Sequence, residues 1–109
     1  MNAEFLCDET FEGYPGVLHG GVISMILDGA MGNCIFARGQ TAVTVEMITK
    51  FRHPIVTCRR ATIKAVILKD THPLYLLEAK IIQDGKIKAT AKGKFYNQPD
   101  LINILKELK

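Results

Sequence analysis

The sequence predicts an α+β fold in which one long helix packs on an antiparallel sheet of about five strands. Between residues 20 and 35 the apolar residues recur with a helical period, and from residue 41 onward the period is two. The strands arrive consecutively, so no crossover helix is left to join parallel neighbours. A single helix beside a run of antiparallel strands is typical of the α+β class.

Length and composition indicate one globular domain over residues 1–109. Hydrophobic residues make up 48% of the chain and charged residues 23%, which is typical of a protein with a packed core. The net charge of +3 is spread along the chain without a block of like charges, and neither an RNP-type strand nor a zinc-finger spacing is present. We therefore expect no nucleic-acid partner.

The cysteines and the first residues of the chain indicate the cellular compartment of the protein. Cys7, Cys34 and Cys58 are odd in number and share no C-x-x-C spacing, so they indicate neither a disulfide framework nor a zinc site. The segment Met1–Glu4 carries an acid and no basic leader, and no apolar run reaches the ~18 residues of a membrane span. We expect a cytoplasmic protein that uses no metal, no cofactor and no membrane.

A short strand is predicted from Ala3 to Cys7, followed by a loop from Asp8 to Leu18 that is rich in glycine and proline. The helix begins near His19 or Gly20. Its apolar positions cover more than the single stripe of a surface helix, which predicts a helix enclosed on most sides. These positions are Val22, Ile23, Ile26, Leu27, Ala30, Met31, Cys34 and Ile35.

One narrow face of this helix is made mostly of small or polar residues: Gly21, Ser24, Met25, Asp28 and Gly32. A charged carboxylate costs several kcal/mol to bury unless it is paired or hydrogen-bonded, so Asp28 either reaches solvent through a cleft or has a function. An acid that only faces solvent, or that meets a base across a subunit boundary, is the alternative. Ser24, one turn earlier, is placed to hydrogen-bond the carboxylate or a bound water.

Four strands of alternating apolar residues follow the helix. Asp84-Gly85 supplies the positive φ angles of a two-residue hairpin, so the last two strands are antiparallel neighbours. His53-Pro54 and His72-Pro73 mark breaks, because proline cannot donate to the hydrogen-bond ladder. A short amphipathic helix is predicted from Pro99. The apolar strand positions are Val43, Val45, Met47, Phe51, Ala61, Ile63, Ala65, Ile67, Tyr75, Leu77, Ala79, Ile81, Ile87, Ala89, Ala91, Gly93 and Phe95.

The segment His19-Gly20-Gly21 lies where a helix N-terminus leaves backbone N–H groups without partners. The glycines expose these donors, which can hold a carbonyl oxygen as it becomes an oxyanion. Glycine pairs also serve ordinary turns, and a histidine here is also typical of a capping residue. Together with Asp28, nine residues after the histidine, the segment predicts both parts of a hydrolytic site: donors that polarise an acyl carbonyl and a carboxylate that attacks it or activates water.

The stretch GYPGVLHGGVISMILDGAMG at residues 13–32, followed by AVTVEMITKFRHPI at residues 42–55, resembles the hotdog-fold acyl-CoA thioesterases of the phenylacetate-degradation (PaaI-like) branch. The resemblance implies a central helix wrapped by the sheet, a dimer that joins two sheets and shares its active sites, and pairing of dimers into a tetramer. It also implies an acyl-CoA substrate, with coenzyme A present only as part of that substrate.

The resemblance assigns roles to individual residues. It makes Asp28 the nucleophile or general base, Gly20 the oxyanion donor through its backbone N–H, and Gly21 the residue that shapes the turn. It implies that His19 orients the loop and that Thr44 positions the attacking water from the partner subunit.

Two positions depart from the family pattern. Gly13 stands six residues before the histidine, where several relatives carry Asn or Gln to hold water or the thioester. Gly29 follows Asp28, where many relatives carry a second carboxylate. These departures keep open an alternative function, a non-catalytic hotdog module that binds acyl-CoA or another apolar ligand. A hotdog dehydratase, which pairs a catalytic histidine with an acid on the central helix, has no independent support.

Four lysines are predicted to share one face of the last strand: Lys86, Lys88, Lys92 and Lys94. A solvated outward face is the ordinary interpretation, since charged residues are seldom buried, and edge lysines also deter sheet-to-sheet aggregation. The alternative is contact with coenzyme A phosphates, for which the arginines near the strand ends are equally suitable.

Overall fold

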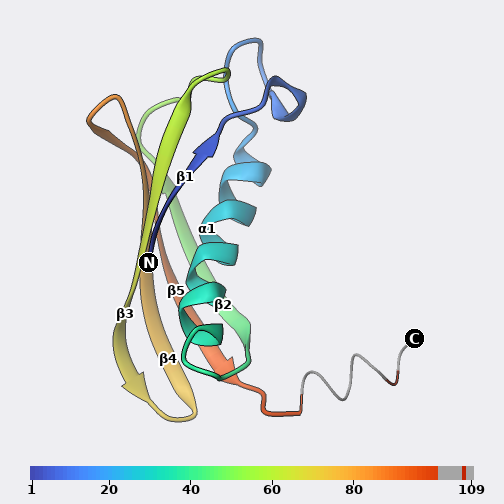
Figure 1. The fold of residues 1–109 in the computed structure, drawn as a ribbon, viewed down its shortest axis with the longest axis vertical. Helices are drawn as coiled ribbons and strands as arrows, with labels where there is room; N and C mark the ends of the chain where they lie inside the picture. Colours follow the sequence, from blue (N-terminus) through green and yellow to red (C-terminus); the bar gives the residue numbers. More distant parts are fainter. Residues whose placement is uncertain (101–106, 108–109) are drawn as a thin grey trace.

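The computed structural model describes residues 1–100 and 107, and it contains one long helix against one face of a five-stranded sheet (Figure 1). The helix, α1, runs from Gly20 to Phe36 and begins at the predicted glycine pair. A short 3-10 helix, η1, covers Glu9–Phe11. The strands are β1 (Asn2–Leu6), β2 (Ala42–Phe51), β3 (Arg60–Thr71), β4 (Leu74–Gln83) and β5 (Lys86–Asn97).

The sheet has the strand order β1-β3-β4-β5-β2, and every neighbouring pair is antiparallel. The α+β class and the five-stranded antiparallel sheet are therefore confirmed. The edges are β1 and β2, so β2 leaves one side of its backbone without a partner strand among the described residues. The helix expected from Pro99 lies outside the described residues.

The turn between β4 and β5 has the predicted geometry. Asp84 has a φ of 53° and Gly85 a φ of 74°. Two successive positive φ angles are those of the tight turn that matches the twist of a hairpin. The breaks at both His-Pro pairs are confirmed as well, because β2 ends at Phe51 and β3 ends at Thr71.

Helix α1 buries one face and leaves another open. Its buried residues are Ile23, Leu27, Ala30, Met31 and Ile35. Met25 and Phe36 are 63% and 64% exposed. The prediction of a helix enclosed on most sides is wrong for the single chain, because the sheet covers only one side of α1 (Figure 1). Exposed apolar residues grouped on one face are typical of an interaction surface.

Two irregularities change which side chains face the helix. In β2, Val45 is an extra residue between Thr44 and Glu46, so Thr44 faces α1 as Met47 does. Val45 itself is 60% exposed, which corrects its predicted place beside Met47. In β5, a register shift beside Ile81 places Ile87 on the outer face of the sheet. Most other predicted apolar positions of β3, β4 and β5 are buried: Ala61, Ile63, Ala65, Tyr75, Leu77, Ala79, Ile81, Ala89, Ala91, Gly93 and Phe95.

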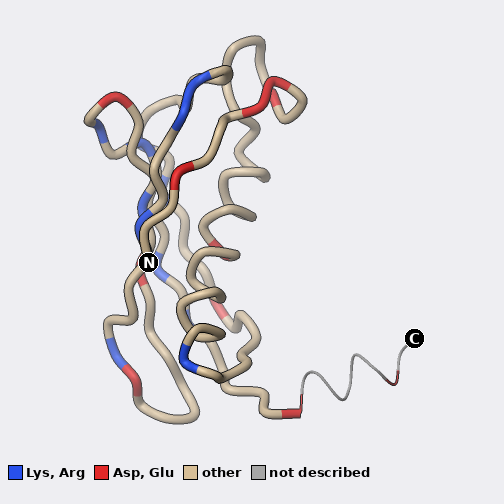
Figure 2. The backbone as a smooth tube through the Cα atoms, viewed as in Figure 1, with Lys and Arg blue, Asp and Glu red and all other residues tan. Residues whose placement is uncertain are grey.

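Charge is distributed unevenly between the helix and the sheet. Asp28 is the only charged residue of α1, whereas basic residues lie along the strands (Figure 2). Across the described residues, no group of three His, Cys, Asp or Glu side chains is arranged to hold a metal ion. None of the described helices has the length and apolar character needed to cross a membrane.

Candidate active site

Asp28 and Thr44 form a hydrogen-bonded pair between α1 and β2. The Thr44 hydroxyl donates to Asp28 Oδ1 at 2.7 Å. Asp28 is half-buried and Thr44 is exposed, so solvent reaches the pair. Both residues belong to the same chain, which corrects the prediction that Thr44 reaches the site from a partner subunit. The bulge at Val45 accounts for the pairing, because it turns Thr44 toward the helix.

The second oxygen of this carboxylate is unoccupied. Within the described residues, Asp28 Oδ2 accepts no hydrogen bond. Ser24 is half-buried one turn earlier on α1 and does not bond the carboxylate in this part of the chain. Thr44 thus holds one oxygen of Asp28 while the other is available to a substrate or a water molecule.

His19 caps the start of α1. Its backbone is extended (φ −63°, ψ 136°), and its Nδ1 accepts a hydrogen bond from the Gly21 N–H at 2.9 Å. This geometry is that of an N-cap residue. A Cβ on Gly21 would lie only 3.1 Å from the same ring nitrogen. A side chain at Gly21 would therefore crowd the cap, and the Gly21 N–H, which is already satisfied, is not a second oxyanion donor.

Like the Val22 N–H, the Gly20 N–H is a free donor in the described start of this helix. No acceptor is bonded to it among the described residues, whereas His19 N–H donates to Phe11 O and Ile23 N–H donates to His19 O. A pocket of about 260 Å³ opens beside Gly20 and is mostly apolar; it is lined by Val17, Leu18, Gly20, Ile23, Phe51, Arg52, His53, Pro54 and Ile55. A free donor beside an apolar pocket suits the carbonyl of an acyl group.

The free N–H and the acid are too far apart on one helix to act on the same carbonyl group. Eight residues separate Gly20 from Asp28, which at the rise of an α-helix is about 12 Å along the axis. Reacting atoms must approach to about 3–3.5 Å. The two parts of the predicted hydrolytic site are therefore not brought together within one chain.

The two glycines that depart from the family pattern both leave space. A Cβ on Gly13 would lie 3.6 Å from His19 Cδ2, so a side chain at this position would extend beside the imidazole. Gly13 N–H donates to Val17 O at 2.9 Å, which closes the loop. Gly29 is exposed, and a Cβ there would meet no atom within 4 Å. Neither position supplies a group that positions water.

A buried side chain that the sequence pattern did not single out supports the loop before the helix. Gln83, at the end of β4, is 1% exposed. It accepts the Val56 N–H at 2.8 Å and donates to Val56 O at 2.9 Å, and its Nε2 lies 3.8 Å from Cys7 Sγ. Burial raises the pKa of the Cys7 thiol. The sequence does carry a signal, since Gln83 continues the buried alternation Tyr75, Leu77, Ala79 and Ile81.

The segment that Gln83 holds is bonded in turn to the loop that leads into α1. Leu18 N–H donates to Ile55 O at 2.9 Å, and Thr57 N–H donates to Gly16 O at 3.1 Å. These two bonds flank Val56, the residue that Gln83 hydrogen-bonds. Gln83 is therefore a positioning residue, because it fixes the segment against which the cap of α1 rests.

Similarity to known proteins agrees with this geometry. A model of the thioesterase superfamily matches residues 15–85. The chain belongs to the thioesterase superfamily. It is 31% identical over 86 residues to acyl-coenzyme A thioesterase THEM4 of Bos taurus, and the match covers 77% of the chain and 35% of that protein. The chain thus spans about a third of the length of this curated relative.

Solved structures of other proteins have the same fold. The hypothetical thioesterase of Streptococcus pneumoniae TIGR4 with coenzyme A superposes with a TM-score of 0.86 at 17% identity, over 90% of this chain and 80% of that one. A Bacillus halodurans protein with CoA gives 0.81 at 24% identity, over 89% and 66%. The Streptococcus pneumoniae protein is also solved as an Asp-to-Ala and as a Thr-to-Ala mutant, at positions sixteen residues apart. The predicted hotdog fold is confirmed.

Proposed function

We propose that the protein is an acyl-CoA thioesterase, which hydrolyses a CoA thioester to a free acid and CoA. The observation that carries this proposal is the Asp28–Thr44 pair. A carboxylate that solvent reaches is the only charge on an apolar helix, and one of its oxygens is held while the other is free. Such a group can act as a nucleophile or as a general base.

The active site is shared between two copies of the chain. Gly20 and Asp28 lie about 12 Å apart along one helix, so they cannot act on the same carbonyl group. A second copy of the chain is needed to bring a Gly20 N–H beside Asp28. An antiparallel pair of α1 helices centred on Ser24 sets Asp28 of one copy level with Gly20 of the other. Each copy then contributes Asp28 and Thr44 to one site and the capped glycine donor to the second.

The exposed surface beside this helix face supports such a dimer. Met25, next to Ser24, is 63% exposed, and Phe51, whose ring lies beside Gly20, is 56% exposed. Strand β2 presents an unpaired backbone edge, which is a template for pairing with a second chain. Pairing at β2 buries this edge and the open side of α1 together. Assembly of two such dimers into a tetramer is a further part of the proposal.

The chemistry follows from these positions. The thioester carbonyl oxygen accepts the Gly20 N–H, which stabilises the oxyanion as it forms. Asp28 Oδ2 either attacks the carbonyl carbon or takes a proton from an attacking water. The C–S bond breaks and the sulfur of CoA leaves as the thiol after protonation. In the first route water then hydrolyses the acyl anhydride on Asp28, and in the second the proton passes from Asp28 to the sulfur.

The relatives support both the substrate class and the pair of residues. The bovine relative is an acyl-coenzyme A thioesterase, and both bacterial structures contain coenzyme A. The aspartate and threonine substituted in the Streptococcus pneumoniae protein have the same spacing as Asp28 and Thr44, sixteen residues. The apolar pocket beside Gly20 is a place for the acyl group.

A thiol-release assay over a panel of acyl-CoA and acyl-carrier thioesters tests the proposal. Asp28→Asn keeps the size of the side chain and an acceptor for Thr44, yet it removes the nucleophile and base. We expect turnover to fall by roughly 10²–10⁴-fold while fold and oligomer persist. Asp70→Asn is the matched control, because Asp70 is exposed and pairs with Arg38 on the surface, away from Asp28. Turnover by the Asp28 variant at the wild-type rate would rule out this role.

One observation favours a second function. Gly13 leaves the space beside the His19 ring without a water-positioning side chain. A non-catalytic module would bind acyl-CoA at the same surface and release no thiol. Calorimetric binding of acyl-CoA by the wild-type chain, with no thiol release across the whole panel, would replace the first proposal with this one.

A further inference from the structure

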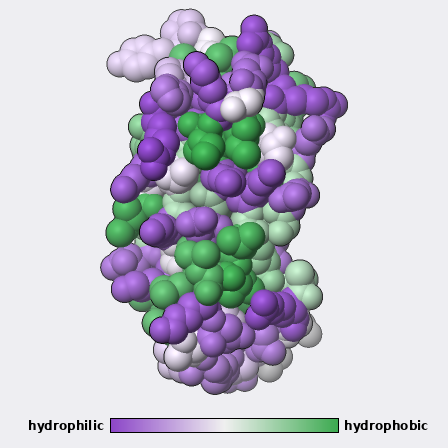
Figure 3. All heavy atoms as spheres, turned by 90° about the vertical axis from the view of Figure 1, so that its left-hand side faces the viewer, coloured by the Kyte–Doolittle hydropathy of each residue, from purple (hydrophilic) through white to green (hydrophobic). Residues whose placement is uncertain are grey.

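A basic depression lies on the outer face of the sheet, opposite to α1. It has a volume of about 410 Å³ and is lined by Ile48, Lys50, Arg52, Glu78, Ala79, Lys80, Ile87, Thr90, Ala91 and Lys92. Figure 3 shows this face, where a hydrophilic band separates two apolar patches. Arg52 is the one residue that the described linings of this depression and of the pocket beside Gly20 share.

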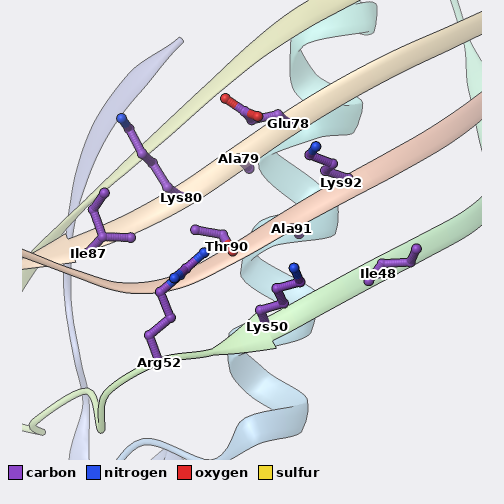
Figure 4. Close-up of a pocket in the computed structure, with 10 residues that line it drawn as sticks. All are labelled: Ile48, Lys50, Arg52, Glu78, Ala79, Lys80, Ile87, Thr90, Ala91 and Lys92. Carbon is purple, nitrogen blue, oxygen red and sulfur yellow. The ribbon is translucent and has the colours of Figure 1, made fainter.

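The strand register assembles the cations of this depression. Thr90 of β5 lies opposite Lys80 of β4 on one side and opposite Lys50 of β2 on the other. Lys92 occupies the next outward position of β5, and Arg52 follows the end of β2. In Figure 4 the Arg52 side chain reaches toward Thr90, with Lys50 and Lys80 on either side. Four cations thus surround one hydroxyl group.

These cations are not neutralised by the described residues. The ion pairs in this part of the chain are Arg38–Asp70, Arg59–Asp84 and Lys94–Glu46, and none includes a cation of the depression. Glu78 is the only acid in the lining, and it lies opposite Lys92 without forming an ion pair. Lys80 also faces Lys64 directly across β3 and β4. Like charges directly opposite one another destabilise a sheet, so the arrangement favours a bound anion.

Protection of a sheet edge does not explain two of these lysines. Lysines protect the edge strands of a sheet against pairing with other chains. Lys80 and Lys92 lie on β4 and β5, which are interior strands. Ile87, rather than Lys86 or Lys88, lines the depression, so the predicted row of four lysines on one face of β5 is wrong. The register shift beside Ile81 is the reason.

We propose that this depression is a second ligand site, which binds the diphosphate group of a small organic molecule such as a nucleoside diphosphate. Lys50, Lys80, Lys92 and Arg52 form charge-assisted hydrogen bonds to the phosphate oxygens, and Arg52 offers the planar fork that binds phosphate through two N–H groups. The Thr90 hydroxyl supplies a neutral donor at the base of the depression. Ile48 and Ile87 provide an apolar wall for the organic part of the ligand.

The site is separate from the proposed thioesterase centre, because α1, Asp28 and Thr44 lie on the other face of the sheet. A diphosphate ligand and an acyl-CoA are therefore expected to bind at the same time. The coenzyme A of the substrate also contains a diphosphate, so the test has to distinguish the two sources.

Calorimetric titration with inorganic pyrophosphate and with ADP tests the proposal, in the wild-type chain and in Asp28→Asn so that the result does not depend on hydrolysis. Lys80→Gln and Arg52→Gln are each expected to weaken binding by about tenfold or more. Lys86→Gln is the matched control, because it removes the same charge from β5 outside the depression. ADP is expected to bind more tightly than pyrophosphate, because only ADP reaches the apolar wall.

The amide signals of Thr90 and Lys92 in a nitrogen–proton NMR spectrum are expected to shift on titration, while the signal of Gly20 stays in place. Failure of both probes to bind at millimolar concentration, or an equal loss of binding in Lys86→Gln, would overturn the proposal. Competition between pyrophosphate and acyl-CoA would overturn it too, since the phosphates would then belong to the substrate site.

Discussion

At the scale of single residues, the site depends on how one carboxylate is held in place on an apolar helix. Among the described residues Asp28 forms no ion pair, and its carboxylate accepts a hydrogen bond from the Thr44 hydroxyl. A hydroxyl orients the carboxylate and leaves its second oxygen open to react. Because Asp28 is half-buried, bulk water competes less for hydrogen bonds to its carboxylate, while Oδ2 stays accessible.

Thr44→Val is expected to separate this role from folding. Valine has nearly the shape of threonine but donates no hydrogen bond, so Asp28 loses its fixed orientation. A hydrogen bond to a charged group is worth roughly 1.5–3 kcal/mol, which predicts a fall in kcat of about ten- to a hundredfold with a smaller change in KM. Thr44→Ser should restore most of kcat. A valine variant with unchanged kcat would show that the hydroxyl has no part in turnover.

At the scale of elements, two segments far apart in sequence determine where the helix cap lies. Gln83, at the end of β4, forms two hydrogen bonds to the backbone of Val56. The residues on either side of Val56 form hydrogen bonds to the loop before α1. The bulge in β2 then brings Thr44 to the middle of the same helix. The cap and the acid are thus positioned by different strands of one sheet.

Gln83→Leu is expected to loosen this support. Leucine fills a similar volume, but it leaves the partly buried Val56 N–H and C=O without the bonds that Gln83 makes, which costs about 1–3 kcal/mol of unfolding free energy. Denaturant unfolding followed by circular dichroism measures the loss. Gln40→Leu, in an exposed loop, should leave the midpoint almost unchanged. Equal midpoints for wild type and Gln83→Leu would contradict the positioning role.

The site residues that could be predicted from the sequence are those that lie in one continuous segment with a recognisable local pattern. His19, Gly20 and Asp28 could be found because a cap, a glycine and an acid at helical spacing belong to one continuous segment. The family resemblance, not the residue pattern, places Thr44 in the partner subunit. The structure instead bonds Thr44 to Asp28 of its own chain, through a bulge at Val45 that the alternation of residues does not reveal. Gln83 was not found from the sequence, although it continues the inward alternation of β4, because its partner Val56 is 27 residues away in the chain.

At the scale of the whole molecule, one chain leaves two different surfaces uncovered. The open side of α1 and the free edge of β2 are apolar, with Met25, Val45 and Phe51 each more than half exposed. The outer face of the sheet instead gathers cations around Thr90. We expect the first surface to bind a second copy of the chain and the second to bind a phosphorylated ligand.

Met25→Glu is expected to dissociate the dimer, because it places a charge at the centre of the helix contact. Light scattering should then report the 12.1 kDa of a single chain, and thiol release should be lost with it. Leu6→Glu is the matched control, since Leu6 is 58% exposed on the opposite edge of the sheet. A dimeric and active Met25→Glu protein would place the subunit contact elsewhere.

The central claim is that Asp28 of one copy works with the Gly20 N–H of the other, and mixing two inactive variants tests it most directly. Gly20→Pro removes only this donor: proline is favoured at the first helical position, and His19 already has the extended backbone that must precede it. Asp28→Asn removes the acid.

Each variant alone is expected to be inactive in thiol release. In a symmetric dimer that exchanges at random, co-expression in equal amounts should restore about a quarter of the wild-type activity, because half of the dimers are mixed and one of their two sites is intact. No activity in the mixture, with mixed dimers demonstrated by two different tags, would show that both groups must come from the same chain and would contradict the shared site.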